Sequence, residues 1–100
     1  MPNIVIIGSG PAGVSAALYA ARAGVKTTIL TKGPGALDRA ELIQNYYGFA
    51  EPISGAELER RGIEGAKALG VQFVTTEAVG LTYMDKLTVE TLAGDFPADA

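Results

Sequence analysis

The sequence predicts an α/β fold: a parallel sheet with flanking helices, followed by a small antiparallel hairpin or meander. Two observations carry this prediction. Residues 4–31 contain an apolar run, a glycine-rich turn, an alanine-rich segment and a second apolar run, in that order. Residues 79–91 alternate in polarity around a short polar turn. The first pattern is typical of a strand–turn–helix–strand unit and the second of a hairpin.

The first strand and the first helix are predicted from residues 4–24. Ile4 to Ile7 is a short β-branched run, as expected of a strand that is buried on both faces of a parallel sheet. Pro11 suits the first helical position, where its missing N–H would have no partner. We expect the helix to run to about Ala23 and to end at Gly24 in the left-handed conformation. Its small apolar side chains predict close packing against a sheet.

A second helix is predicted by a capping box at Ser54-Gly55-Ala56-Glu57, in which the serine caps the helix and the glutamate reaches back. This helix should begin at residue 55, carry a Glu57–Arg61 pair and stop at Gly70. Gly62 and Gly65 inside it lower its intrinsic stability, so we expect another backbone to pack closely there.

The other elements are strands and one long loop. Thr27 to Thr31 is the second strand, and residues 36–53 have no sustained period, which predicts a loop. Val71 to Thr75 is the third strand. Val79 to Tyr83 and Leu87 to Thr91 form the hairpin, and a further strand could begin at 96–100.

Composition excludes several functions for this chain. It has 100 residues, which allows one small domain, and its charge of −3 argues against a nucleic-acid or anionic-membrane partner. It contains no cysteine and no histidine, which excludes a redox dithiol, a thiolate or zinc site and a histidine base. Glycines and a proline interrupt the N-terminal apolar run, so we expect neither a signal peptide nor a membrane span. A soluble, cytoplasmic protein is expected.

The glycine turn Gly8-Ser9-Gly10-Pro11-Ala12-Gly13 is the main candidate site. In a dinucleotide-binding turn, the first glycine permits the tight turn and the second lets a pyrophosphate approach the backbone. The third lets helix and strand pack closely. The helix N-terminus offers free N–H groups and partial positive charge to the phosphates. The alternative is a purely structural glycine turn.

The residue that would hold a ribose hydroxyl is missing from its usual place. A dinucleotide-binding unit commonly carries an acid about 20 residues after the turn, at the end of the second strand. Thr31 and Lys32 stand there, and the nearest acids in the sequence are Asp38 and Glu41. A lysine at this point could favour a 2′-phosphate, and hence NADP.

Two segments resemble the low-molecular-weight thioredoxin reductases. The stretch from Ile7 to Gly13, followed by Ala16-Ala17-x-Tyr19-Ala20-Ala21-Arg22, is similar to the opening of that family. Ile43-Gln44-Asn45-Tyr46-Tyr47-Gly48-Phe49 resembles its Asn-Tyr-Pro-Gly-Phe segment, although a tyrosine replaces the proline. The family's Gly-Gly-Gln-Leu stretch is also replaced, by Gly35-Ala36-Leu37-Asp38. The resemblance covers essentially the whole chain.

This resemblance implies a Rossmann-like FAD-binding domain of an NAD(P)H-dependent oxidoreductase, of which residues 1–100 are the N-terminal part. The NAD(P)H domain, with its cysteine pair, and the C-terminal part of the FAD domain would lie outside this chain. The glycine turn would bind FAD, and the backbone around Thr75 and Thr76 would border the adenine. Asn45 would approach the flavin or its ribityl chain, unless it only stabilises a turn. The chemistry would belong to the isoalloxazine, so no catalytic residue is expected here.

Two other functions remain open from the sequence. One is a truncated, non-catalytic nucleotide-binding or interaction module, and the other is a short NAD(P)-dependent dehydrogenase. Since no later strand obviously covers the second side of Ile4 to Ile7, this edge should invite pairing with another copy. We therefore expect a homodimer or other self-association.

Overall fold

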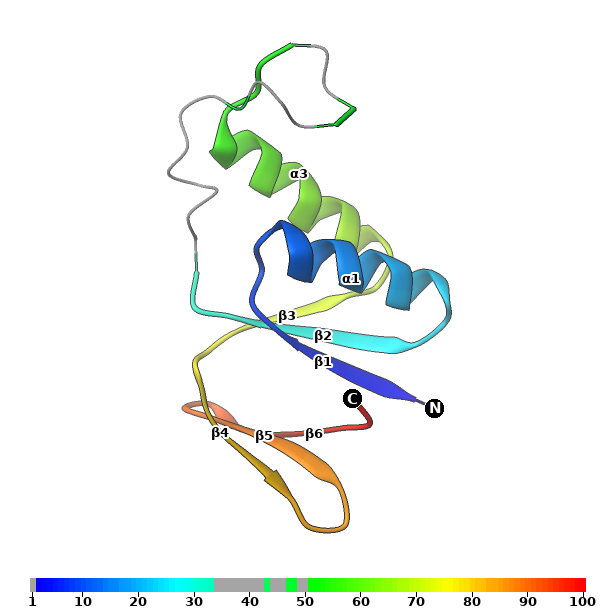
Figure 1. Ribbon diagram of the computed structural model, residues 1–100, viewed down its shortest axis with the longest axis vertical. Helices are drawn as coiled ribbons and strands as arrows, with labels where there is room; N and C mark the ends of the chain where they lie inside the picture. Colours follow the sequence, from blue (N-terminus) through cyan, green and yellow to red (C-terminus); the bar gives the residue numbers. More distant parts are fainter. Residues whose placement is uncertain (1, 34–42, 44–46, 49–50) are drawn as a thin grey trace.

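The computed structural model describes residues 2–33, 43, 47–48 and 51–100 of the chain. It confirms the predicted fold class, a parallel sheet with helices and a separate antiparallel meander (Figure 1). The predicted helices and strands are present, with ends that differ from the predicted ones by a residue or two. In chain order the elements are β1 (Asn3–Ile7), α1 (Pro11–Arg22), β2 (Lys26–Thr31), α3 (Gly55–Ala68), β3 (Gln72–Thr75), β4 (Ala78–Tyr83), β5 (Leu87–Thr91) and β6 (Gly94–Ala98).

The first sheet is parallel and has the strand order β1-β2-β3. Both helices lie on one side of it, and the meander of β4, β5 and β6 lies on the other (Figure 1). The core lies between the helices and the sheet, where five residues from four elements or their ends pack together: Val14, Ala17, Ile29, Ala66 and Val71. Ile29 and its neighbour Leu30 point to opposite faces of β2 and are both buried, so both faces of this central strand are covered.

The helix ends follow the sequence signals with one correction. Pro11 is the first residue of α1, and Gly24 just beyond its end has φ +81°. The Ser54 hydroxyl accepts a hydrogen bond from the Glu57 amide at 3.1 Å, as predicted for α3. The Glu57 carboxylate does not reach back, however, because it bonds to the guanidinium groups of Arg60 and Arg61. These charge-assisted bonds are stronger than one to a neutral amide.

The prediction of close backbone packing at the two glycines of α3 is wrong. A Cβ atom on Gly62 would lie 3.5 Å from a methyl carbon of Val14, which is an ordinary side-chain contact. A Cβ atom on Gly65 would meet nothing within 4 Å. Gly65 therefore lowers helix propensity without a packing reason that the structure shows.

The hairpin is confirmed, and the further strand expected after it completes a three-stranded meander. A third antiparallel strand, β6, follows a turn in which the Thr91 hydroxyl accepts from the Ala93 amide at 3.0 Å. This strand begins at Gly94, earlier than the sequence suggested, because Gly94 and Pro97 obscure its pattern. Pro97 is tolerated because β6 is an outer strand of the meander.

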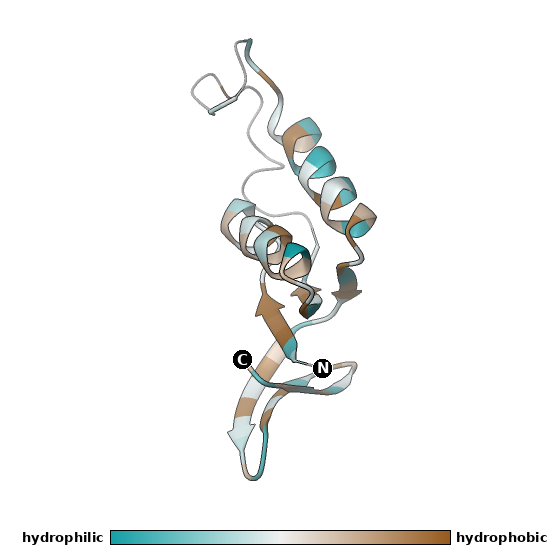
Figure 2. Ribbon diagram, turned by 90° about the vertical axis from the view of Figure 1, so that its right-hand side faces the viewer, coloured by the Kyte–Doolittle hydropathy of each residue, from teal (hydrophilic) through white to brown (hydrophobic). Residues whose placement is uncertain are grey.

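The outer edge of β1 is partly covered, which the sequence did not predict. The Val5 amide donates to the Ala100 carbonyl at 3.0 Å, and the Asp99 amide donates to the Asn3 carbonyl at 2.9 Å. The C-terminal residues therefore run along this strand. Figure 2 shows the strongly hydrophobic colour of β1, and Ile7 at its end remains 61% exposed.

Across the described ranges, neither helix is long and apolar enough to cross a membrane.

Candidate functional site

The candidate site lies at the edge of the parallel sheet where β1, β2 and β3 end (Figure 1). Two backbone hydrogen bonds join the three strand ends. The Gly8 amide donates to the Leu30 carbonyl at 2.8 Å, and the Thr76 amide donates to the Thr31 carbonyl at 2.9 Å. The glycine turn, the end of β2 and the residues after β3 are therefore neighbours, as expected for ligand sites in open α/β sheets.

Gly8 and Gly13 make the tight connection from β1 into α1 possible. Gly8 has φ +112°, a conformation that other residues rarely adopt. A Cβ atom on Gly13 would lie 2.2 Å from the Gly8 carbonyl oxygen and 3.4 Å from a side-chain carbon of Ile6. No other residue fits at position 13 without a shift of the turn backbone. Helix and strand pack at this point as the glycine pattern predicted.

The N-terminus of α1 is open and uncapped. Gly10 precedes the helix in an extended conformation, and a Cβ atom there would meet no atom of the described residues within 4 Å. The first helical hydrogen bond runs from the Val14 amide to the Gly10 carbonyl at 3.0 Å. The amides of Ala12 and Gly13 lie before it, so the helix itself offers them no acceptor. Among the described residues no side chain caps this end, and its first turn contains no acid, so the local field favours an anion.

Hydroxyl groups fix the turn to the end of β2. The buried Ser9 side chain lies with its Oγ 2.7 Å from Oγ1 of Thr31. The same Thr31 oxygen accepts from the Gly33 amide at 3.1 Å. Beside them, Oγ1 of Thr76 is buried and has no hydrogen-bond partner within the described part of the chain. The carboxyl edge of the sheet therefore carries a hydrogen-bonded hydroxyl network, and beside it the Thr76 hydroxyl, which can bond to a ligand.

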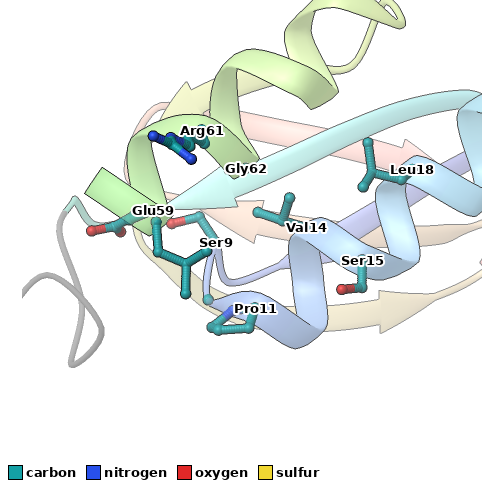
Figure 3. A pocket seen from close by; sticks show the side chains of 10 residues that line it. Ser9, Pro11, Val14, Ser15, Leu18, Glu59, Arg61 and Gly62 are labelled. Atoms are coloured by element: carbon teal, nitrogen blue, oxygen red, sulfur yellow. The ribbon is translucent and has the colours of Figure 1, made fainter. Parts of the chain in front are cut away.

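A pocket of about 240 Å³ opens beside the turn, between α1 and α3 (Figure 3). Side chains of Val14, Leu18 and Leu58 give it an apolar lining. Ser9, Ser15, Glu59 and Arg61 supply its polar groups. An apolar recess next to an anion-accepting helix end suits a ligand that joins a phosphate to an uncharged group.

A fixed ion-pair cluster lies on α3 beside this pocket. Nε of Arg60 and Nε of Arg61 each lie 2.9 Å from a carboxylate oxygen of Glu57. These hydrogen bonds lower the pKa of Glu57 from 4.5 to about 2. The pKa of Arg60 is raised by its bonds to Glu57 and Glu64. Glu57 is therefore ionised at neutral pH and supplies a negative charge there rather than an acid or a base.

The structure brings together every described residue that the sequence singled out. The structure places the two threonine-containing strand ends beside the turn: Thr31 and Lys32 at the end of β2, and Thr75 and Thr76 at the end of β3, lie next to Gly8, Ser9, Gly10, Pro11, Ala12 and Gly13. Asn45 lies outside the described residues.

The sequence alone does not predict that α3 lines the pocket, and it does not predict that Glu77 lies beside Lys32. Nζ of Lys32 lies 3.7 Å from Oε1 of Glu77. The signal for Glu77 is its place two residues after the end of β3, since the carboxyl ends of parallel strands share one edge.

Comparison with known proteins gives consistent results. The family profile of the pyridine nucleotide-disulphide oxidoreductases matches residues 2–96. A thioredoxin reductase of Aquifex aeolicus is 44% identical over 79 residues, which are 77% of this chain and 24% of that protein. One of Streptomyces coelicolor is 37% identical over 97 residues, which are 92% of this chain and 30% of that protein. The crystal structure of an atypical thioredoxin reductase from Desulfovibrio vulgaris Hildenborough matches with a TM-score of 0.90 and 40% identity, over 99% of this chain and 33% of that one.

The chain spans only about a quarter to a third of the length of these relatives. Within that span, the profile match runs over nearly every residue and the fold matches closely. The chain therefore belongs to the pyridine nucleotide-disulphide oxidoreductase family.

Proposed function

We propose that residues 1–100 form the N-terminal part of an FAD-binding domain and that the glycine turn holds the pyrophosphate of FAD. The observation that carries this proposal is the start of α1 behind Gly10, which no side chain of the described residues caps and where a Cβ atom would meet none of their atoms within 4 Å. A phosphate can approach this backbone, and the amides at the helix end can donate to it. The residues present therefore fit the pyrophosphate.

The other predicted residues would hold the two ends of the same cofactor. Thr31, Lys32, Thr75 and Thr76 would border the adenosine, since they lie at the ends of β2 and β3. The apolar pocket between α1 and α3 adjoins the turn at Ser9, Gly10 and Pro11 and offers room for an uncharged part of the cofactor. Asn45 would approach the flavin or its ribityl chain.

FAD is favoured over a nicotinamide cofactor by the relatives, which are named thioredoxin reductases. The complete protein would be an NAD(P)H-dependent, thioredoxin reductase-like enzyme, with NADPH as the expected co-substrate. Its flavin would pass reducing equivalents from the nicotinamide to a disulfide. The residues of this chain would bind and orient the cofactor and supply no catalytic group. A cytoplasmic, homodimeric enzyme is the expected form.

The two alternatives have less support. A non-catalytic interaction module does not account for the family match over residues 2–96 or for an open anion site behind Gly10. A short NAD(P)-dependent dehydrogenase is disfavoured by the relatives, which are named thioredoxin reductases.

The substitution Gly10→Ser tests the proposal. A serine is a preferred N-cap residue, and its hydroxyl would bond to the amides that a phosphate would otherwise use. We expect unchanged or slightly higher stability, by a few tenths of a kcal/mol, together with FAD binding weakened by about tenfold or more. Equilibrium dialysis with FAD and urea unfolding measure the two effects.

Gly65→Ser is the matched control, because position 65 is open and lies far along α3 from the turn. It should leave FAD binding unchanged. A wild-type chain that takes up no FAD and shows no flavin absorbance would contradict the proposal.

A further inference from the structure

We propose that Glu77 is the carboxylate that selects an adenosine ribose without a 2′-phosphate, and that Lys32 is its counter-ion. This inference rests on the proposed function and names the specificity of the adenosine end of that site. The acid that the sequence lacks after β2 would thus come from the segment after β3.

The backbone holds Glu77 in place from both sides. On one side, the Thr76 amide donates to the Thr31 carbonyl at 2.9 Å, which ties the segment to the end of β2. On the other side, the Leu92 amide donates to the Glu77 carbonyl at 3.2 Å, which ties it to the meander. Glu77 is therefore fixed at the carboxyl edge of the parallel sheet, where the ribose of a bound dinucleotide lies.

The contact between Glu77 and Lys32 leaves the carboxylate available. Nζ of Lys32 and Oε1 of Glu77 are 3.7 Å apart, which is longer than a charge-assisted hydrogen bond, and both side chains are largely exposed. An ionised carboxylate has about four acceptor positions, so one loose ion pair leaves room for the two ribose hydroxyls.

The same pair explains why Lys32 need not favour a 2′-phosphate. A lone lysine at the end of β2 would attract a phosphate dianion, whereas the Glu77 carboxylate next to it repels one and neutralises the lysine. A hydroxyl donates to a carboxylate, but a phosphate cannot. The arrangement therefore favours FAD over a 2′-phosphorylated dinucleotide such as NADPH.

The test measures the affinity of the 100-residue chain for two nucleotides: ADP, and ADP that carries a 2′-phosphate. We expect the wild type to bind ADP more tightly, and Glu77→Gln to lower this preference by about tenfold, because the hydroxyls then donate to a neutral amide oxygen and the 2′-phosphate meets Lys32 without a neighbouring carboxylate. Adding Lys32→Gln to that variant should weaken binding of the 2′-phosphate compound again. Glu90→Gln, the same charge change on β5, is the control and should leave the preference unchanged.

The outcomes separate this inference from the proposed function. If the wild type binds ADP and Glu77→Gln leaves the preference unchanged, the role of Glu77 is overturned and the pyrophosphate site stands. If the wild type binds neither nucleotide, both are overturned. Circular dichroism of each variant shows whether its fold is intact. The double variant gives a second test, because it should restore part of the preference for ADP that Glu77→Gln removes.

Discussion

The side-chain oxygens of Ser9 and Thr31 lie 2.7 Å apart and join two positions that are 22 residues apart in the chain. Ser9 belongs to the glycine turn and Thr31 ends β2, so this bond links the phosphate-facing loop to the sheet. Because Thr31 also accepts from the Gly33 amide at 3.1 Å, one threonine orders both the turn and the exit of β2. The glycines permit the turn, and these hydroxyls hold it in place.

A double-mutant cycle at this pair should show coupling. We expect Ser9→Ala to lower the free energy of unfolding by about 1 kcal/mol, and Thr31→Val by about 1–3 kcal/mol because the bonds of its hydroxyl to Gly33 are lost as well. The double variant should be less destabilised than the sum of the two, by about 0.5–1.5 kcal/mol. Urea unfolding of the four proteins measures this, and strict additivity would show that the contact contributes nothing.

The two helix glycines Gly13 and Gly65 should respond in opposite ways to alanine. Gly13→Ala places a methyl group 2.2 Å from the Gly8 carbonyl oxygen, so the turn must shift. We expect a loss of about 1–3 kcal/mol together with weaker FAD binding. Gly65→Ala adds its methyl in open space and should stabilise α3 by up to ~1 kcal/mol with FAD binding unchanged. Thermal unfolding and dialysis compare them, and equal effects at both positions would contradict the structure.

The sequence alone was sufficient to predict the local part of the site. Glycines at 8, 10 and 13 and Pro11 report directly on backbone conformation, and the structure shows the turn, the positive φ of Gly8 and the close approach at Gly13. These features can be predicted from the sequence because each depends on neighbours within a few residues.

The features that sequence reasoning missed depend on contacts between distant segments. Glu77 was overlooked because its relation to Lys32 exists only once β2 and β3 pair in register. The cover over β1 was overlooked because Asp99 and Ala100 lie at the other end of the chain. Gly65 was given a packing role that the structure does not support, since a glycine inside a helix has no local signature for what lies opposite it.

Acid should remove the contribution of Glu57 to stability. The pKa of Glu57 is lowered from 4.5 to about 2 by Arg60 and Arg61, so its carboxylate stabilises the folded chain at neutral pH. This stabilisation should be fully present above about pH 4.5 and should disappear as the pH falls toward 2. Glu57→Gln should therefore unfold more easily than the wild type at pH 7 and equally at pH 2. A difference that persists at pH 2 would show that the ion pairs are not its cause.

Self-association remains a prediction, but the structure points to strand β4 rather than the edge of β1 as the contact surface. The edge of β1 is partly covered, whereas β4 is an uncharged outer strand of the meander with Val79, Leu81 and Tyr83 exposed by 60, 64 and 76%. Exposed apolar edges without charges are prone to pair with another copy. We expect the sedimentation coefficient to rise with concentration, and Leu81→Lys to reduce that rise more than Leu92→Lys, which places the same charge in a nearby turn. A single monomeric species at all concentrations would contradict the prediction, and equal effects of the two lysines would exclude β4 as the contact.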